Sequence, residues 1–92
     1  MKKVFNLTIK SLQNDMSDIR AEIEYGGYTE EAGWMCLDLV NRMTGLLCEN
    51  INDELANYIM DNLDFWYSTT KLVMTVAHAD DPDFSTEKYL GF

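Results

Sequence analysis

The architecture of this 92-residue chain depends first on residues 3–25, KVFNLTIKSLQNDMSDIRAEIEY. Within residues 3–12, the apolar residues Phe5, Leu7 and Ile9 alternate with polar ones, which is the period of a strand with one buried face. Apolar and charged residues alternate again over residues 18–25. The five residues between these segments are mostly polar and typical of a short connection. The stretch therefore predicts an antiparallel hairpin with strands at residues 3–12 and 18–25.

A helix is predicted next, over residues 29–48. The Gly26-Gly27 pair ends the second strand, and Thr29 is a suitable N-cap with two glutamates directly after it. Apolar residues from Cys36 to Leu47 then recur at steps of three and four residues.

A second helix is predicted over residues 52–67. Asn50 or Asn52 provides its cap, and two acidic residues follow in the first turn. Its apolar residues lie at helical spacing from Leu55 to Trp66.

The end of the chain predicts a third strand. Residues 71–79 are apolar on both faces, as in the centre of a sheet, and a turn at residues 80–83 leads to a short C-terminal segment, 84–92. The order β-β-α-α-β predicts an α+β fold in a single domain, residues 1–92. We expect a two-layer sandwich in which a small, three-stranded, mostly antiparallel sheet packs on two helices.

Charge and hydropathy exclude several classes of function. The chain has 7 Lys and Arg against 16 Asp and Glu, a net charge of −9, which argues against direct nucleic-acid binding because that requires basic residues to neutralise phosphates. No apolar run approaches the length of a membrane span, and polar residues interrupt any signal-peptide core near the N-terminus. We expect a cytoplasmic protein.

The residues of common catalytic and metal sites do not form a recognisable motif. The single histidine, His78, has no nucleophile in a typical setting beside it. Cys36 and Cys48 lie on one apolar helix, about 18 Å apart along its axis, and are interpreted as reduced core thiols. Zinc-type Cys and His spacing and glycine-rich nucleotide loops are missing from the sequence, and the acidic turn around Pro82 lacks the pattern of a calcium loop. The prediction is a non-enzyme without metal or cofactor.

The acidic residues are distributed unevenly. No basic residue occurs between Arg42 and Lys71, and within this interval Glu54, Asn57, Asp61 and Asp64 form one stripe of the second helix, opposite its apolar side. One interpretation is a solvated face that keeps the protein soluble. The other is a surface for a basic partner, in the manner of a nucleic-acid mimic, because a row of carboxylates complements a groove lined by Lys and Arg.

Three consecutive aromatic residues end this helix. Phe65, Trp66 and Tyr67 cannot all face one core on a helix that turns about 100° per residue, so at least one ring is expected at the surface. Trp66 or Tyr67 is the predicted anchor at an interface with a partner or a second copy.

These features together predict a non-catalytic acidic protein-binding module. Small acidic phage proteins that block restriction or CRISPR systems are similar in size and charge, so we expect a phage or prophage inhibitor that covers the basic surface of a nucleic-acid-binding defence complex. The alternative is a self-associating structural or regulatory module, such as a homodimer, whose acidic face serves only solubility. The predicted partner-binding residues are Asp53, Glu54, Asn57, Asp61, Asp64, Trp66 and Tyr67.

Overall fold

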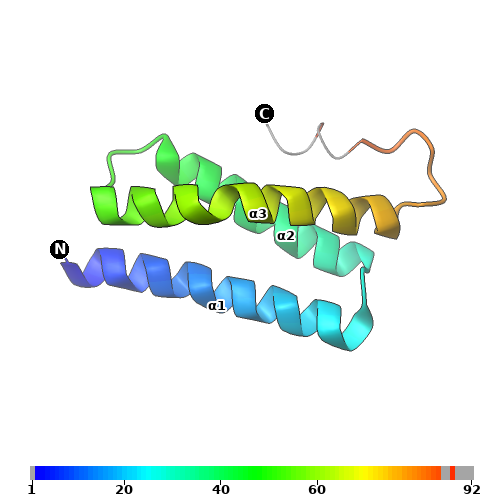
Figure 1. The fold of residues 1–92 in the computed structure, drawn as a ribbon, viewed down its shortest axis with the longest axis horizontal. Coiled ribbons are helices and arrows are strands. Elements are labelled where there is room, and N and C mark those ends of the chain that lie inside the picture. The colour runs from blue at the N-terminus through cyan, green and yellow to red at the C-terminus, as the bar shows by residue number, and fades with distance from the viewer. Residues whose placement is uncertain (1, 86–87, 89–92) are drawn as a thin grey trace.

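The described part of the chain forms three helices, α1 (Lys2–Gly26), α2 (Glu30–Leu47) and α3 (Asp53–Ala77) (Figure 1). The computed structural model describes the backbone of residues 2–85 and of Lys88, and the side chains of residues 9–85 and of Lys88. These residues contain no strand. The fold is therefore all-α, and the predicted α+β sandwich with a three-stranded sheet is wrong.

The predicted β-hairpin is a single helix, α1. Leu12, Met16 and Ile19 are buried and recur at steps of four and three residues, and the partly buried Ile9 and Ile23 extend the same stripe in both directions. Met16, which lies in the predicted connection, is only 3% exposed. The alternation that predicted two strands arises from short parts of this helical stripe, because a few residues can fit both the two-residue period of a strand and the 3.6-residue period of a helix.

A glycine turn separates α1 from α2. Gly27 has a φ of 81°, in the left-handed region that ends many helices, and its N–H donates to the Ile23 carbonyl at 2.7 Å. The glycine pair ends an element as predicted, although that element is a helix.

The predicted helix at residues 29–48 is present as α2. Thr29 is its N-cap, because the threonine hydroxyl accepts a hydrogen bond from the Ala32 N–H at 3.2 Å. Glu30 and Glu31 occupy the first turn, where the helix dipole favours negative charge.

The helix α3 starts as predicted and ends ten residues later than predicted. The Asn52 side chain accepts a hydrogen bond from the Leu55 N–H at 2.9 Å and caps the helix. The predicted strand at residues 71–79 is wrong, because Thr70 and Val73 continue the buried stripe of α3 at a three-residue step. Its β-branched residues favour a strand only weakly, and packing against α2 determines the outcome.

The interface between α2 and α3 is the largest of the three helix–helix interfaces described, and α1 packs against both of these helices. In Figure 1, α1 runs beside α3 in the same direction, and α2 crosses behind α3 in the opposite direction. All three helices contribute to one core, whose largest fully buried side chains include Trp66, Leu12, Ile19, Leu39 and Met43.

The chain turns back after α3. The His78 and Phe84 rings stack with centroids 3.9 Å apart, so residues 79–85 stay close to the end of the helix. Within the predicted turn at 80–83, the Asp83 N–H donates to the Asp81 side chain at 3.1 Å. The predicted C-terminal segment at 84–92 lies outside the described residues, apart from residues 84, 85 and 88.

Candidate protein-binding surface

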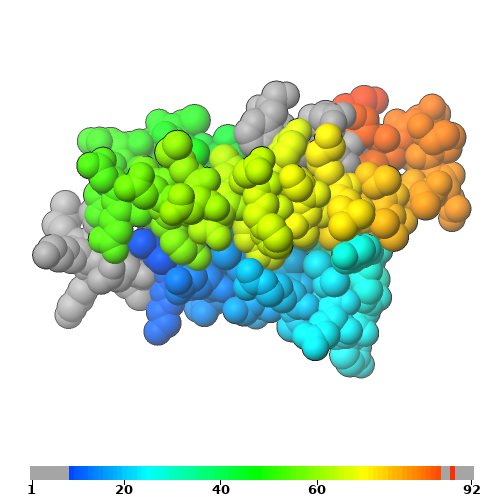
Figure 2. All heavy atoms as spheres, viewed as in Figure 1, coloured from blue at the N-terminus to red at the C-terminus, as the bar shows by residue number. Residues whose placement is uncertain are grey.

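Five polar side chains of α3 form its acidic face, and all five are exposed. The helix lies at the front of the molecule, with its outer surface uncovered in this view (Figure 2). These side chains lie opposite the buried residues Leu55, Ile59 and Trp66, since the two sets occupy different sides of one helix. The predicted outward orientation is therefore observed for the whole set: Asp53, Glu54, Asn57, Asp61 and Asp64.

The carboxylates of the acidic face have no ion-pair partner among the side chains of residues 9–85. The next lysine along the helix, Lys71, lies over the Tyr67 ring, 5.7 Å from its centroid. Arg42 instead pairs with Asp15 and Asp38, and Arg20 lies over the Trp66 ring, 5.3 Å from its centroid. The negative charge of the face is thus directed into solvent.

The three consecutive aromatic residues have different environments. Trp66 is 1% exposed and belongs to the core, so the predicted role of its ring as a surface anchor does not fit its position. Tyr67 is partly buried, whereas Phe65 is 58% exposed and meets the Trp66 ring edge-on at 5.4 Å. The rotation of about 100° per residue separates the rings as expected, but the exposed ring is Phe65.

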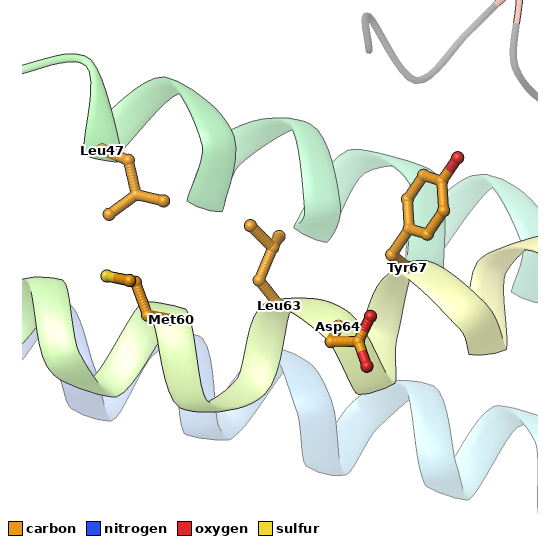
Figure 3. A pocket seen from close by; sticks show the side chains of 5 residues that line it. All are labelled: Leu47, Met60, Leu63, Asp64 and Tyr67. Carbon is orange, nitrogen blue, oxygen red and sulfur yellow. The ribbon is translucent and has the colours of Figure 1, made fainter.

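An open apolar groove of about 480 Å³ lies between α2 and α3, beside the acidic face (Figure 3). Leu47 of α2 lies across from Met60 and Leu63 of α3, and Tyr67 lies at the far end. Asp64 of the acidic face also lines the groove. Met60 is 65% exposed. Its position directly before Asp61 is the one sequence signal that could have indicated an apolar side chain at the edge of the acidic face.

A second apolar hollow, of about 400 Å³, lies between α1 and α3. Phe65, Leu72 and Tyr28 line it together with Ile23 of α1. Arg20 and Glu24 contribute charges of both signs to this hollow, whereas the charged residue that lines the first groove is Asp64.

The cysteines occupy different environments and form no disulfide. Burial raises the pKa of the Cys36 thiol to about 11, against the opposing effect of a hydrogen bond with Thr70, so this thiol is protonated at neutral pH. Cys48 is exposed where α2 ends, and the prediction that it is a core thiol is wrong.

His78 has a mainly structural environment. Its ring stacks on Phe84 and meets Trp34 edge-on at 6.5 Å, and its Nε2 lies 3.8 Å from a Glu30 carboxylate oxygen. The predicted acidic turn at residues 80–83 is exposed. Over the described residues, no three His, Cys, Asp or Glu side chains come together as a metal site would require.

The function of the chain has to be inferred from the chemistry of its surface, because comparisons with known proteins give no match. No protein family, curated protein or solved structure matches this chain. Over the residues described, none of the three helices combines the length and hydropathy needed to cross a bilayer. Over the described residues, the structure therefore shows three helices, an exposed acidic face on α3 and an apolar groove beside it.

Proposed function

We propose that this chain is a protein-binding module that covers a basic surface of its partner with the acidic face of α3. The observation that carries the proposal is the exposure of all five residues of this face without an ion-pair partner among the described residues. Such a face attracts a surface rich in Lys and Arg, and the attraction steers the two proteins together.

The length of the face suits a nucleic-acid-binding groove. Residues 53–64 extend over roughly 17 Å of helix axis, and the rigid helix holds the carboxylates in a row. A groove that normally binds phosphates presents Lys and Arg along a comparable row. The proposed partner is a bacterial nucleic-acid-binding defence complex, which the chain inhibits by occupying the site of its nucleic acid.

The proposed mechanism consists of binding without a chemical step. Cys36, the buried thiol, is kept protonated by its raised pKa and is enclosed by the core, which opposes a nucleophilic role. Steric and electrostatic occlusion requires only that the helix be rigid, and its burial against α1 and α2 provides this.

Affinity capture from a bacterial lysate, at low and at moderate salt, tests the proposal. The tagged chain is compared with the variant Glu54→Lys/Asp61→Lys/Asp64→Lys. The matched control, Asp18→Lys/Glu24→Lys/Asp80→Lys, makes the same change in net charge at exposed positions outside the acidic face. We expect the chain and the control to capture a basic nucleic-acid-binding protein, and the first variant to lose it. Capture of no basic protein, or equal capture by both variants, contradicts the proposal.

Self-association is the second candidate function. Phe65, Leu72 and Val76 are exposed along one edge of α3, and exposed apolar residues at helical spacing are typical of contacts between copies. Light scattering tests this function: a dimer that Phe65→Ser dissociates and Asp61→Lys leaves intact supports it. A monomer at all concentrations eliminates it.

A further inference from the structure

The pair formed by α2 and α3 has two grooves, and the described residues fill one of them with a helix. On one side, α1 inserts Leu12, Met16 and Ile19 into the core. On the other side, none of the three helices fills the groove lined by Leu47 and Met60, as far as the described residues show, and α1 lies on the far side of α3 from it (Figure 3). The α2–α3 pair thus has a second position at which a helix can pack.

The open groove combines an apolar floor with carboxylates on its α3 side, and Lys71 lies over the Tyr67 ring at its far end, 5.7 Å from the ring centroid. Met60 and Leu63 form the α3 side of the floor, while Asp64 lines the same groove and Asp61 is exposed next to Met60 in the chain. Methionine side chains adapt to varied apolar partners, and an exposed one is common in grooves that bind helices.

We infer that this groove binds an amphipathic helix of the partner, with apolar side chains on one face and Lys or Arg along the edge that meets Asp61 and Asp64. The inference rests on the proposed function and specifies the structural element of the partner that is recognised. Apolar residues of such a helix, spaced at three and four positions, contact Leu47, Met60 and Leu63, and its cations pair with the carboxylates of the acidic face.

Charge selects this occupant over a second copy of the chain. The protein has a net charge of −9, and two copies joined symmetrically through this groove would bring their acidic faces together. Like charges placed opposite each other weaken such an interface. A cationic helix instead supplies the counterions that the described residues 9–85 do not provide.

The test uses two synthetic peptides and the full chain. The first peptide, of about 18 residues, carries Leu on one helical face and Lys on the other; the second has the same composition in an order without an apolar face. Calorimetry measures affinity, and amide chemical shifts of the labelled protein locate the contact. We expect the amphipathic peptide to bind about tenfold more tightly and to shift the signals of Leu47, Met60, Leu63 and Tyr67.

Two neutral substitutions separate the groove from the acidic face. Met60→Gln removes an exposed apolar side chain from the groove without changing charge, and should lower the affinity by about fivefold. Phe65→Gln is the matched control, because Phe65 is similarly exposed on α3 but lies outside this groove, and should change the affinity by less than about twofold.

The possible failures distinguish the inference from the proposed function. Four results would each overturn the inference: equal binding of the two peptides, binding of neither peptide, equal effects of the two substitutions, or chemical-shift changes confined to the hollow at Phe65 and Leu72. Charge-dependent capture from the lysate would still support the proposed role of the acidic face. A dimer that Met60→Gln dissociates would assign the groove to a second copy and also overturn the inference.

Discussion

Gly33 on α2 lies against Met74 on α3, so closely that a Cβ atom at the glycine would overlap the methionine sulfur. Both residues are buried. The absence of a side chain at Gly33 lets the two helices approach at this point, and their interface is the largest among the three helices described. The close approach of α2 and α3 therefore explains why a glycine occurs inside α2, although a glycine within a helix otherwise lowers its stability.

Substitution of Gly33 by Ala should destabilise the protein. Met74 is fully buried and its Cγ also lies close to the added Cβ, so the side chain cannot swing into solvent, and the overpacking costs about 1–3 kcal/mol against a gain of up to about 1 kcal/mol from better helix propensity. Gly45→Ala is the control, because no atom lies within 4 Å of a Cβ at this exposed position of the same helix, and it should raise the free energy of unfolding by about 0.5–1 kcal/mol. Urea denaturation measures both. Equal effects of the same sign would contradict the packing described here.

Trp66 should behave as a core residue rather than as an interface anchor. Trp66→Ala removes a ring that is 1% exposed and should lower the free energy of unfolding by about 3–5 kcal/mol. Phe65→Ala, at the exposed neighbour, should cost less than about 1 kcal/mol. Chemical denaturation of the two variants checks this order. A larger loss of stability for Phe65→Ala than for Trp66→Ala would contradict the buried position of Trp66.

The sequence predicted the helix starts well and the N-terminal helix badly. Thr29 and Asn52 are effective caps whose signal lies within a few residues, so α2 and the start of α3 could be located. In α1, polar residues surround Met16, and the two flanking segments each fit a two-residue period. Only the complete stripe from Ile9 to Ile23 distinguishes a helix, because each short window matches both patterns.

The candidate surface was predictable only in part. The orientation of Glu54, Asp61 and Asp64 follows from helical spacing, since charged residues avoid the core. The groove depends on how α2 crosses α3, which places Leu47 near Met60, and local spacing does not contain this tertiary information. The continuation of α3 beyond residue 67 was missed for a different reason: its buried stripe passes through the polar Thr70, and apolar residues on both sides of 71–79 hide the helical period.

The two cysteines should react at very different rates. Cys48 is exposed and should react with a thiol reagent such as Ellman's reagent within minutes, whereas Cys36 is fully buried with a raised pKa and should react only when the protein opens. Counting the thiols modified before and after addition of urea checks this prediction. Rapid modification of both thiols in the native protein would contradict the buried position of Cys36.

Ionisation of Cys36 should make the protein less stable at high pH. Burial raises the pKa of this thiol from 9.0 to about 11, so between these values the folded state holds a proton that the unfolded state releases. The thiol has little effect on stability well below pH 9; between about pH 9 and 11 the free energy of unfolding should fall by up to about 1.4 kcal/mol per pH unit, and above pH 11 this contribution should level off. Comparison of denaturation curves with those of Cys36→Ala isolates this contribution, and identical slopes would contradict it.

Charge reversal on the acidic face should leave folding intact. Asp61→Lys places a cation three residues before Asp64 and relieves repulsion, which should raise the free energy of unfolding by a few tenths of a kcal/mol. Thermal denaturation at low salt checks this expectation. A large destabilisation would mean that Asp61 has a structural role in addition to its exposed position.

The most direct measurement is the salt dependence of affinity between the purified chain and the basic protein it captures. The neutral variant Glu54→Gln/Asp61→Asn/Asp64→Asn keeps side-chain size while it removes three charges from the acidic face. If this face binds the partner, the affinity of the unmodified chain falls as salt increases, and the variant binds more weakly with a flatter dependence. Equal affinities, or a salt dependence that the three substitutions do not change, would contradict the role of the acidic face.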